Sequence, residues 1–143
     1  MGLKHRKHKE VITMAQLNPR ELDVLNILWK SGQPMTSTDI VNEMRGLTQS
    51  TVIAVLRKLL KDNLVEVCGV THSGKVLSRT SRPTEESREV IMNNFATDYA
   101  NFKNVISQSD ICAAILHVED TPEKLKAEIK KLKAVISDCE KKL

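Results

Sequence analysis

One segment of the chain combines side chains that could read the surface of a nucleic acid. Between Thr48 and Asp62, apolar residues recur at helical spacing, and the opposite side of the expected helix is small, polar and basic. An amide can hydrogen-bond to base edges, small side chains let a helix approach the bases, and lysine and arginine bind phosphates. We therefore predict DNA contacts from that side of the helix, which holds Gln49, Ser50, Ile53, Ala54, Arg57, Lys58 and Lys61.

Two shorter helices should position this one. Asn18 and Glu21 have the spacing of a capping box at the start of a first helix, which Gly32 ends. Either Thr36 or Ser37 begins a second helix, and a break around Gly46 precedes the third. The apolar side of the third helix should face the first two with Val52, Val55, Leu56, Leu59 and Leu60.

The hydrophobic period changes after the third helix. Residues 64–70 and 75–80 have the β-branched content of short strands, and residues 71–74 between them resemble a turn. Three helices followed by a hairpin predict a winged helix-turn-helix. We expect the tip of this wing to contact the DNA backbone through His72, Ser73 and Lys75.

The C-terminal part is expected to be helical as well. The pattern predicts a helix from Thr84 to about Ala100, an apolar segment over 102–118 and a last helix beginning at Thr121. Apolar residues of the last helix alternate in steps of four and three, which is the heptad pattern of helices that pair. This stripe is the predicted dimerisation surface, and it holds Leu125, Ile129, Leu132, Ile136 and Cys139.

Together these elements predict a mainly α protein with a small β-hairpin. We divide it into a basic, flexible tail (1–10), a winged-helix DNA-binding domain (11–82) and a helical dimerisation domain (83–143). Aromatic residues make up only 3% of the chain, which favours packed helices over a β-sandwich. A winged helix can also serve only as a protein-interaction module, and the basic face could be ordinary solvated surface.

Charge is distributed unevenly along the 143 residues, whose net charge is +4. Residues 1–82 carry a net charge of +6 and residues 83–143 a net charge of −2, so we expect a polyanionic partner for the first part only. The three widely spaced cysteines indicate reduced thiols in a cytoplasm, and no apolar run is long enough for a membrane span. Because the chain has no metal-ligand cluster, nucleophile elbow or glycine-rich phosphate loop, we expect neither an enzyme nor a bound cofactor or metal.

Two motifs resemble those of the penicillinase-repressor family of bacterial transcriptional repressors. The family's opening pattern E-x-x-V/L-x-x-x-L/I-W is matched by residues 21–29, and its recognition-helix pattern T-V-x-x-x-L-x-[KR]-L by residues 51–59. The resemblance implies a homodimer that binds a dyad-symmetric operator in double-stranded DNA and is joined by its C-terminal helices. By position, it also implies groove contacts from Ser50, Thr51, Ile53, Ala54 and Lys58.

The same resemblance suggests how repression could be relieved. In the β-lactam branch of the family, a sensor protease system leads to cleavage of the repressor at an Asn-Phe bond in its dimerisation region. This chain has two such bonds, Asn94–Phe95 and Asn101–Phe102, although the family's site should fall nearer 113–118. The copper branch uses paired CxC motifs, which this chain lacks. Cleavage at Asn101–Phe102 is one candidate release step, with a sensor protease as an additional partner; the alternative is that Asn and Phe are adjacent there by chance in a helical segment.

Overall fold

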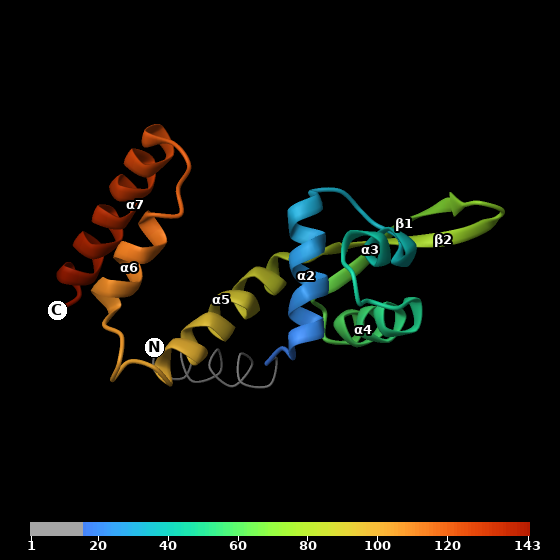
Figure 1. The fold of residues 1–143 in the computed structure, drawn as a ribbon, viewed down its shortest axis with the longest axis horizontal. Coiled ribbons are helices and arrows are strands. Elements are labelled where there is room, and N and C mark those ends of the chain that lie inside the picture. Colours follow the sequence, from blue (N-terminus) through green and yellow to red (C-terminus); the bar gives the residue numbers. More distant parts are fainter. Residues whose placement is uncertain (1–15) are drawn as a thin grey trace. The chain divides into compact units, whose positions relative to one another are not determined.

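The computed structural model describes residues 16–143, except for the side chain of Ser73. The chain divides into two compact units, one up to Thr97 and one from Asp98 onward, and each is described by itself. Figure 1 shows the order of the elements. The predicted basic tail over 1–10 lies outside the described residues.

Three helices open the first unit: α2 (Pro19–Ser31), α3 (Ser37–Glu43) and α4 (Gln49–Lys61). The predicted capping box is confirmed, because the Asn18 side chain accepts a hydrogen bond from the Glu21 amide while the Glu21 carboxylate accepts one from the Asn18 amide. Thr36, rather than Ser37, caps α3 and forms a second capping box with Asp39. These local bonds satisfy amide groups that the first turn of each helix leaves free.

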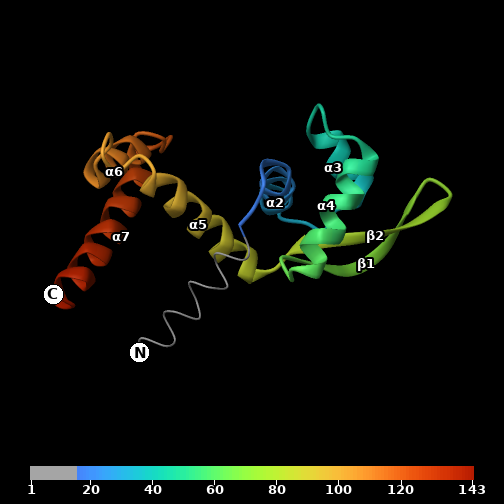
Figure 2. The ribbon, with the colours of Figure 1, turned by 90° about the horizontal axis from the view of Figure 1, so that it is seen from below.

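The hairpin consists of β1 (Val65–Ser73) and β2 (Val76–Pro83), which pair antiparallel. Both strands are longer than the sequence predicted. The predicted turn at 71–74 is wrong, because Ser73 pairs with Val76 and the connection shrinks to Gly74 and Lys75. Gly74 has φ of +68°, which suits a two-residue hairpin turn. The hairpin therefore runs well past α3 and α4, as Figure 2 shows.

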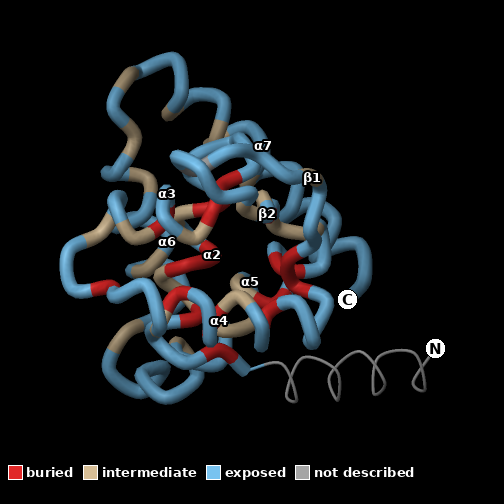
Figure 3. The backbone as a smooth tube through the Cα atoms, turned by 90° about the vertical axis from the view of Figure 1, so that its right-hand side faces the viewer, coloured by how far each residue is buried: buried red, intermediate tan, exposed pale blue. Residues whose placement is uncertain are grey.

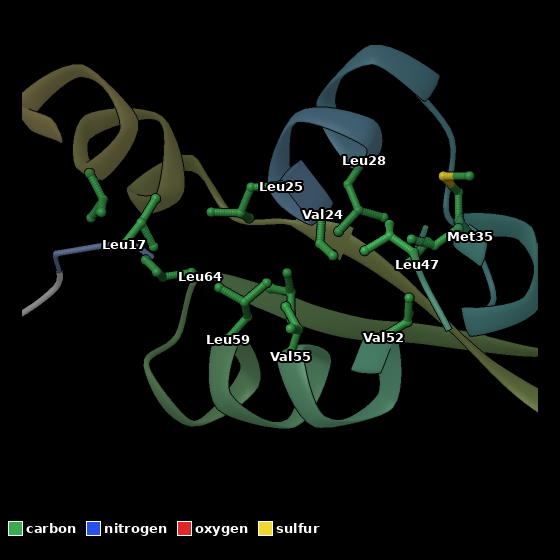
Figure 4. Close-up of a cluster of buried hydrophobic side chains, with 13 residues drawn as sticks. Leu17, Val24, Leu25, Leu28, Met35, Leu47, Val52, Val55, Leu59 and Leu64 are labelled. Atoms are coloured by element: carbon green, nitrogen blue, oxygen red, sulfur yellow. The ribbon is translucent and has the colours of Figure 1, made fainter. Parts of the chain in front are cut away.

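One hydrophobic core holds the first unit together. Figure 4 shows α2 and α4 facing each other across it, with Val24, Leu25 and Leu28 on one side and Val52, Val55 and Leu59 on the other. Figure 3 likewise shows buried segments on both helices. The predicted inward position of Leu60 is wrong: its side chain is 42% exposed. Each residue advances about 100° around a helix, so Leu60 lies to one side of the stripe formed by Val52, Val55 and Leu59.

The helix α5 (Glu85–Ala100) begins on this first unit. Ser87 and Val90 are buried, and Val90 belongs to the same core as α2 and α4. The indole nitrogen of Trp29 donates to the Ser87 hydroxyl at 2.9 Å. The sequence places a domain boundary between residues 82 and 83, whereas the contacts divide the chain after Thr97, because the first half of α5 helps to cover the core.

The second unit contains the end of α5, α6 (Gln108–Leu116) and α7 (Pro122–Lys141). The Tyr99 hydroxyl donates to the Ile106 carbonyl at 2.9 Å, and Ser107 and Thr121 cap the two following helices. Neither α6 nor α7 contains a buried residue. Among the described helices, none is both long and apolar enough to cross a membrane.

Candidate nucleic-acid interface

The start of α4 is held in place by a small network of side chains. Thr48 caps the helix, and its hydroxyl donates to the Thr51 hydroxyl at 2.8 Å. The Gln49 amide nitrogen donates to the Ser37 hydroxyl at 2.6 Å, which ties the first turn of α4 to the first turn of α3. Gln49 therefore keeps its carbonyl oxygen and one amide hydrogen available for a base edge, while the hydroxyl of half-buried Thr51 faces the cap.

Most of the predicted contact residues on α4 are open to solvent. Ile53 is 43% exposed, and five further residues on the predicted side are also exposed: Gln49, Ser50, Ala54, Arg57 and Lys61. Small and polar side chains therefore lie at the helix start, and cations lie further along it. This arrangement permits a close approach to bases near the first turn and phosphate contacts near the last.

Lys58 differs from the other predicted contacts because it has a partner within the protein. Its ammonium nitrogen lies 3.0 Å from both carboxylate oxygens of Glu21; it donates a hydrogen bond to Oε1 and approaches Oε2 without hydrogen-bond geometry. The Glu21 side chain is only 2% exposed, whereas that of Lys58 is 54% exposed. A buried carboxylate is costly without a counter-charge, so Lys58 stabilises the packing of α4 on α2.

The wing contributes further polar groups. His72 and Lys75 are exposed at the end of the hairpin, and Ser73 closes β1 there. Nearer the body of the unit, Arg82 and Glu66 form an ion pair across the strands at 2.6 Å, and this hydrogen bond with Glu66 raises the pKa of Arg82 above its usual value. The predicted wing residues thus lie at the tip, and the base of the wing is neutralised by its own pair.

Arg79 is a candidate contact that sequence reasoning missed. It lies in β2 opposite Val70, and its exposed side chain lines a groove between α4 and the hairpin together with Arg57. Side chains alternate between the two faces of a strand, so Arg79 lies on the same face of β2 as buried Ser81, which also lines the groove. This alternation could have identified Arg79 from the sequence. Within residues 16–143, no carboxylate pairs with either arginine.

Comparison with known proteins identifies the family. The sequence profile described as penicillinase repressor matches residues 17–138. The chain belongs to the penicillinase repressor family. The resemblance carried by residues 21–29 and 51–59 is therefore confirmed, and it extends through the C-terminal helices of this repressor-family chain. None of the curated proteins matches it.

Several solved structures resemble this repressor-family chain in fold. The S. aureus MepR–DNA complex is 15% identical, with a TM-score of 0.50, and the match covers 94% of this chain and 93% of that one. A MarR-family regulator from Enterococcus faecalis V583 is 14% identical, with a TM-score of 0.49 and coverage of 69% and 91%. At these identities the first match supports the fold alone. The predicted winged helix-turn-helix is confirmed.

The predicted dimerisation stripe lies along one side of α7. Within the second unit, Leu125, Ile129 and Leu132 are half-buried, whereas Ile136 is 56% exposed and Cys139 is also exposed. The stripe therefore presents apolar surface that its own unit leaves partly uncovered.

The other predicted features of the chain fall in different places. Asn101 and Phe102 lie in an exposed turn between α5 and α6. Among residues 16–143, no three histidine, cysteine, aspartate or glutamate side chains gather closely enough to hold a metal ion.

Proposed function

We propose that this chain is a homodimeric transcriptional repressor that binds a dyad-symmetric operator in double-stranded DNA through α4 and the wing. The observation that carries the proposal is the open polar side of α4, which the first unit leaves exposed while it buries the opposite side. Family membership supports the same function. In this reading, α4 enters the major groove.

Each group on α4 has a role that its chemistry suits. The Gln49 carbonyl accepts from an amino group on a base edge, and the small side chains of Ser50 and Ala54 allow the helix to come close. Ile53 offers apolar contact to a thymine methyl group. Arg57, Lys61 and the wing residue Lys75 bind phosphates and release counterions, while His72 and Ser73 on the wing can add hydrogen bonds to the DNA backbone. Lys58 contributes mainly by holding α4 against Glu21.

Dimerisation supplies much of the affinity in this proposal. Two copies would pair through the α7 stripe and present two winged domains to the two halves of an operator. When one domain has bound, the other experiences an effective concentration on the order of millimolar, which raises the overall affinity well above that of a single domain.

Release by proteolysis extends the proposal. Exposed turns are the preferred sites of cleavage, and Asn101–Phe102 lies in one, with Phe102 56% exposed. A sensor protease that cuts there would separate α6 and α7 from the winged domain, and the second binding event would no longer be intramolecular. Repression would end because affinity falls, without any change in α4.

A fluorescence anisotropy titration tests the DNA-binding proposal. The full chain is titrated with a labelled duplex from the promoter upstream of its own gene and with a random duplex of equal length, at ~150 mM salt. We expect clear preference for the promoter duplex. The Arg57→Ala variant should bind more weakly and reduce the slope of log K against log salt by about one.

Lys130→Ala is the matched control, because it removes one positive charge from the side of α7 opposite the stripe. It should leave the affinity and the slope unchanged. If the chain binds both duplexes equally and Arg57→Ala behaves like the control, the chain is a protein-interaction module without specific DNA readout, and the proposal is wrong.

A further inference from the structure

The groove between α4 and the hairpin has features that DNA binding alone does not require. It encloses about 310 Å³ and is lined by residues from α3, α4 and both strands. Its apolar lining comes from α4 and β1 and consists of Ile53, Leu56, Leu60, Val65 and Val67. Leu60 and Val67 are each about two-fifths exposed, so apolar surface of the groove is open to solvent.

Two cations line the same groove. Arg57 on α4 and Arg79 on β2 bring guanidinium-bearing side chains to it from two directions, and the described part of the chain offers neither of them a carboxylate. Ser37 and Ser78 add hydroxyl groups. An apolar lining combined with paired donors is complementary to a molecule that is apolar in its body and anionic at one end.

We propose that this groove binds a small amphipathic organic anion, an aromatic carboxylate or sulfonate of one or two rings. The ring system would lie against Leu56, Leu60 and Val67, and the anionic group would accept hydrogen bonds from Arg57 and Arg79. Ligand pockets usually enclose about 300–1,000 Å³, so this groove suits a molecule at the small end of that range.

The position of the groove gives such a ligand a regulatory effect, and this part rests on the proposed function. Ile53 and Arg57 line the groove and also belong to the side of α4 assigned to DNA. A bound anion would occupy the guanidinium of Arg57 and place negative charge where a phosphate must approach. Ligand and DNA would therefore bind in competition, and each would lower the affinity for the other by the same factor.

Methyl NMR on the full chain tests the site itself, with 1-naphthoate as the probe. We expect saturable shifts for the methyl groups of Ile53, Leu60 and Val67, while those of Ile129 and Ile136 on α7 stay in place. The neutral analogue 1-naphthamide should bind with an affinity at least about tenfold lower, because it lacks charge-assisted hydrogen bonds. Shifts confined to α7, or equal affinity for the amide, would overturn the proposal.

Two variants locate the binding site. Val67→Phe should fill the groove and weaken naphthoate binding about tenfold or more, whereas Val118→Phe adds the same ring at an exposed position of the second unit and should have no effect. Arg79→Gln removes one guanidinium from an exposed position without threatening the core, and it should also weaken binding about tenfold. Unchanged naphthoate affinity in both Val67→Phe and Arg79→Gln contradicts the site.

Competition is measured separately by anisotropy with the promoter duplex. Saturating naphthoate should weaken DNA binding about tenfold. A chain that binds naphthoate in the groove but binds no duplex would refute the proposed function and leave this site standing. A chain that binds the duplex but not naphthoate would refute the site alone. Simultaneous binding without competition would refute the regulatory effect.

Discussion

Replacing Lys58 by methionine should destabilise the first unit more than any other loss of an exposed cation from α4. The change keeps most of the length of the side chain and removes its charge, so Glu21 loses its ammonium partner at 3.0 Å while its own side chain is 2% exposed. The Asn18 amide is then the described hydrogen-bond donor that still reaches this carboxylate.

The magnitude follows from the burial of the two partners. Breaking a fully buried ion pair costs about 3–5 kcal/mol, whereas a surface pair contributes at most about 1 kcal/mol. Lys58 is 54% exposed, so water can replace part of its interaction with Glu21. We therefore expect the free energy of unfolding to fall by about 1–3 kcal/mol, as for the loss of a hydrogen bond to a charged group.

Chemical denaturation followed by the fluorescence of Trp29, the single tryptophan, measures this loss. Lys61→Met is the matched control: Lys61 lies on the same helix, and no described carboxylate pairs with it. It should change the free energy of unfolding by less than about 0.5 kcal/mol. In the double variant Glu21→Gln with Lys58→Met, much of the loss should be recovered, because no buried charge is left unpaired.

The reasoning would be refuted if Lys58→Met were as stable as the unchanged chain. If this variant also lost DNA affinity and reduced the salt dependence by about one ion, Lys58 would be a phosphate contact and not a link between α2 and α4.

Three further predictions concern other parts of the chain. Ser87→Ala removes the acceptor of the Trp29 indole and should cost about 1 kcal/mol in a denaturation experiment; Ser109→Ala, at an exposed position, should cost almost nothing. Asn63 has φ of +61°, so Asn63→Ala should lower the free energy of unfolding by about 1 kcal/mol more than Asn63→Gly; both variants lose the hydrogen bond from Asn63 to Glu86, so equal losses would contradict the backbone argument. Ile129→Lys should convert a dimer to monomers in light scattering and weaken operator binding, whereas a dimer that survives this change would place the interface elsewhere.

The local features of the first unit followed from short spacings in the sequence. The Asn18–Glu21 capping box lies within one turn of helix, and its geometry does not depend on the rest of the fold. Asparagine tolerates the left-handed conformation that often ends a helix, and Asn63, just after α4, has a φ of +61°. The ends of the hairpin were less accessible to this reasoning, because the pairing of Ser73 with Val76 depends on register between strands.

What the sequence determined by itself is the family, the order of the elements and the polar side of α4, because these depend on motifs and on periods of three to four residues. Only the tertiary structure decided what the cations on that side contact. Lys58 meets Glu21, which is 37 residues away in the chain, and Arg57 shares a groove with Arg79 on a different element. Electrostatic interactions and burial act through space, so Lys58 gained a carboxylate partner when α4 packed against α2, whereas Lys61 on the same helix has no described carboxylate partner.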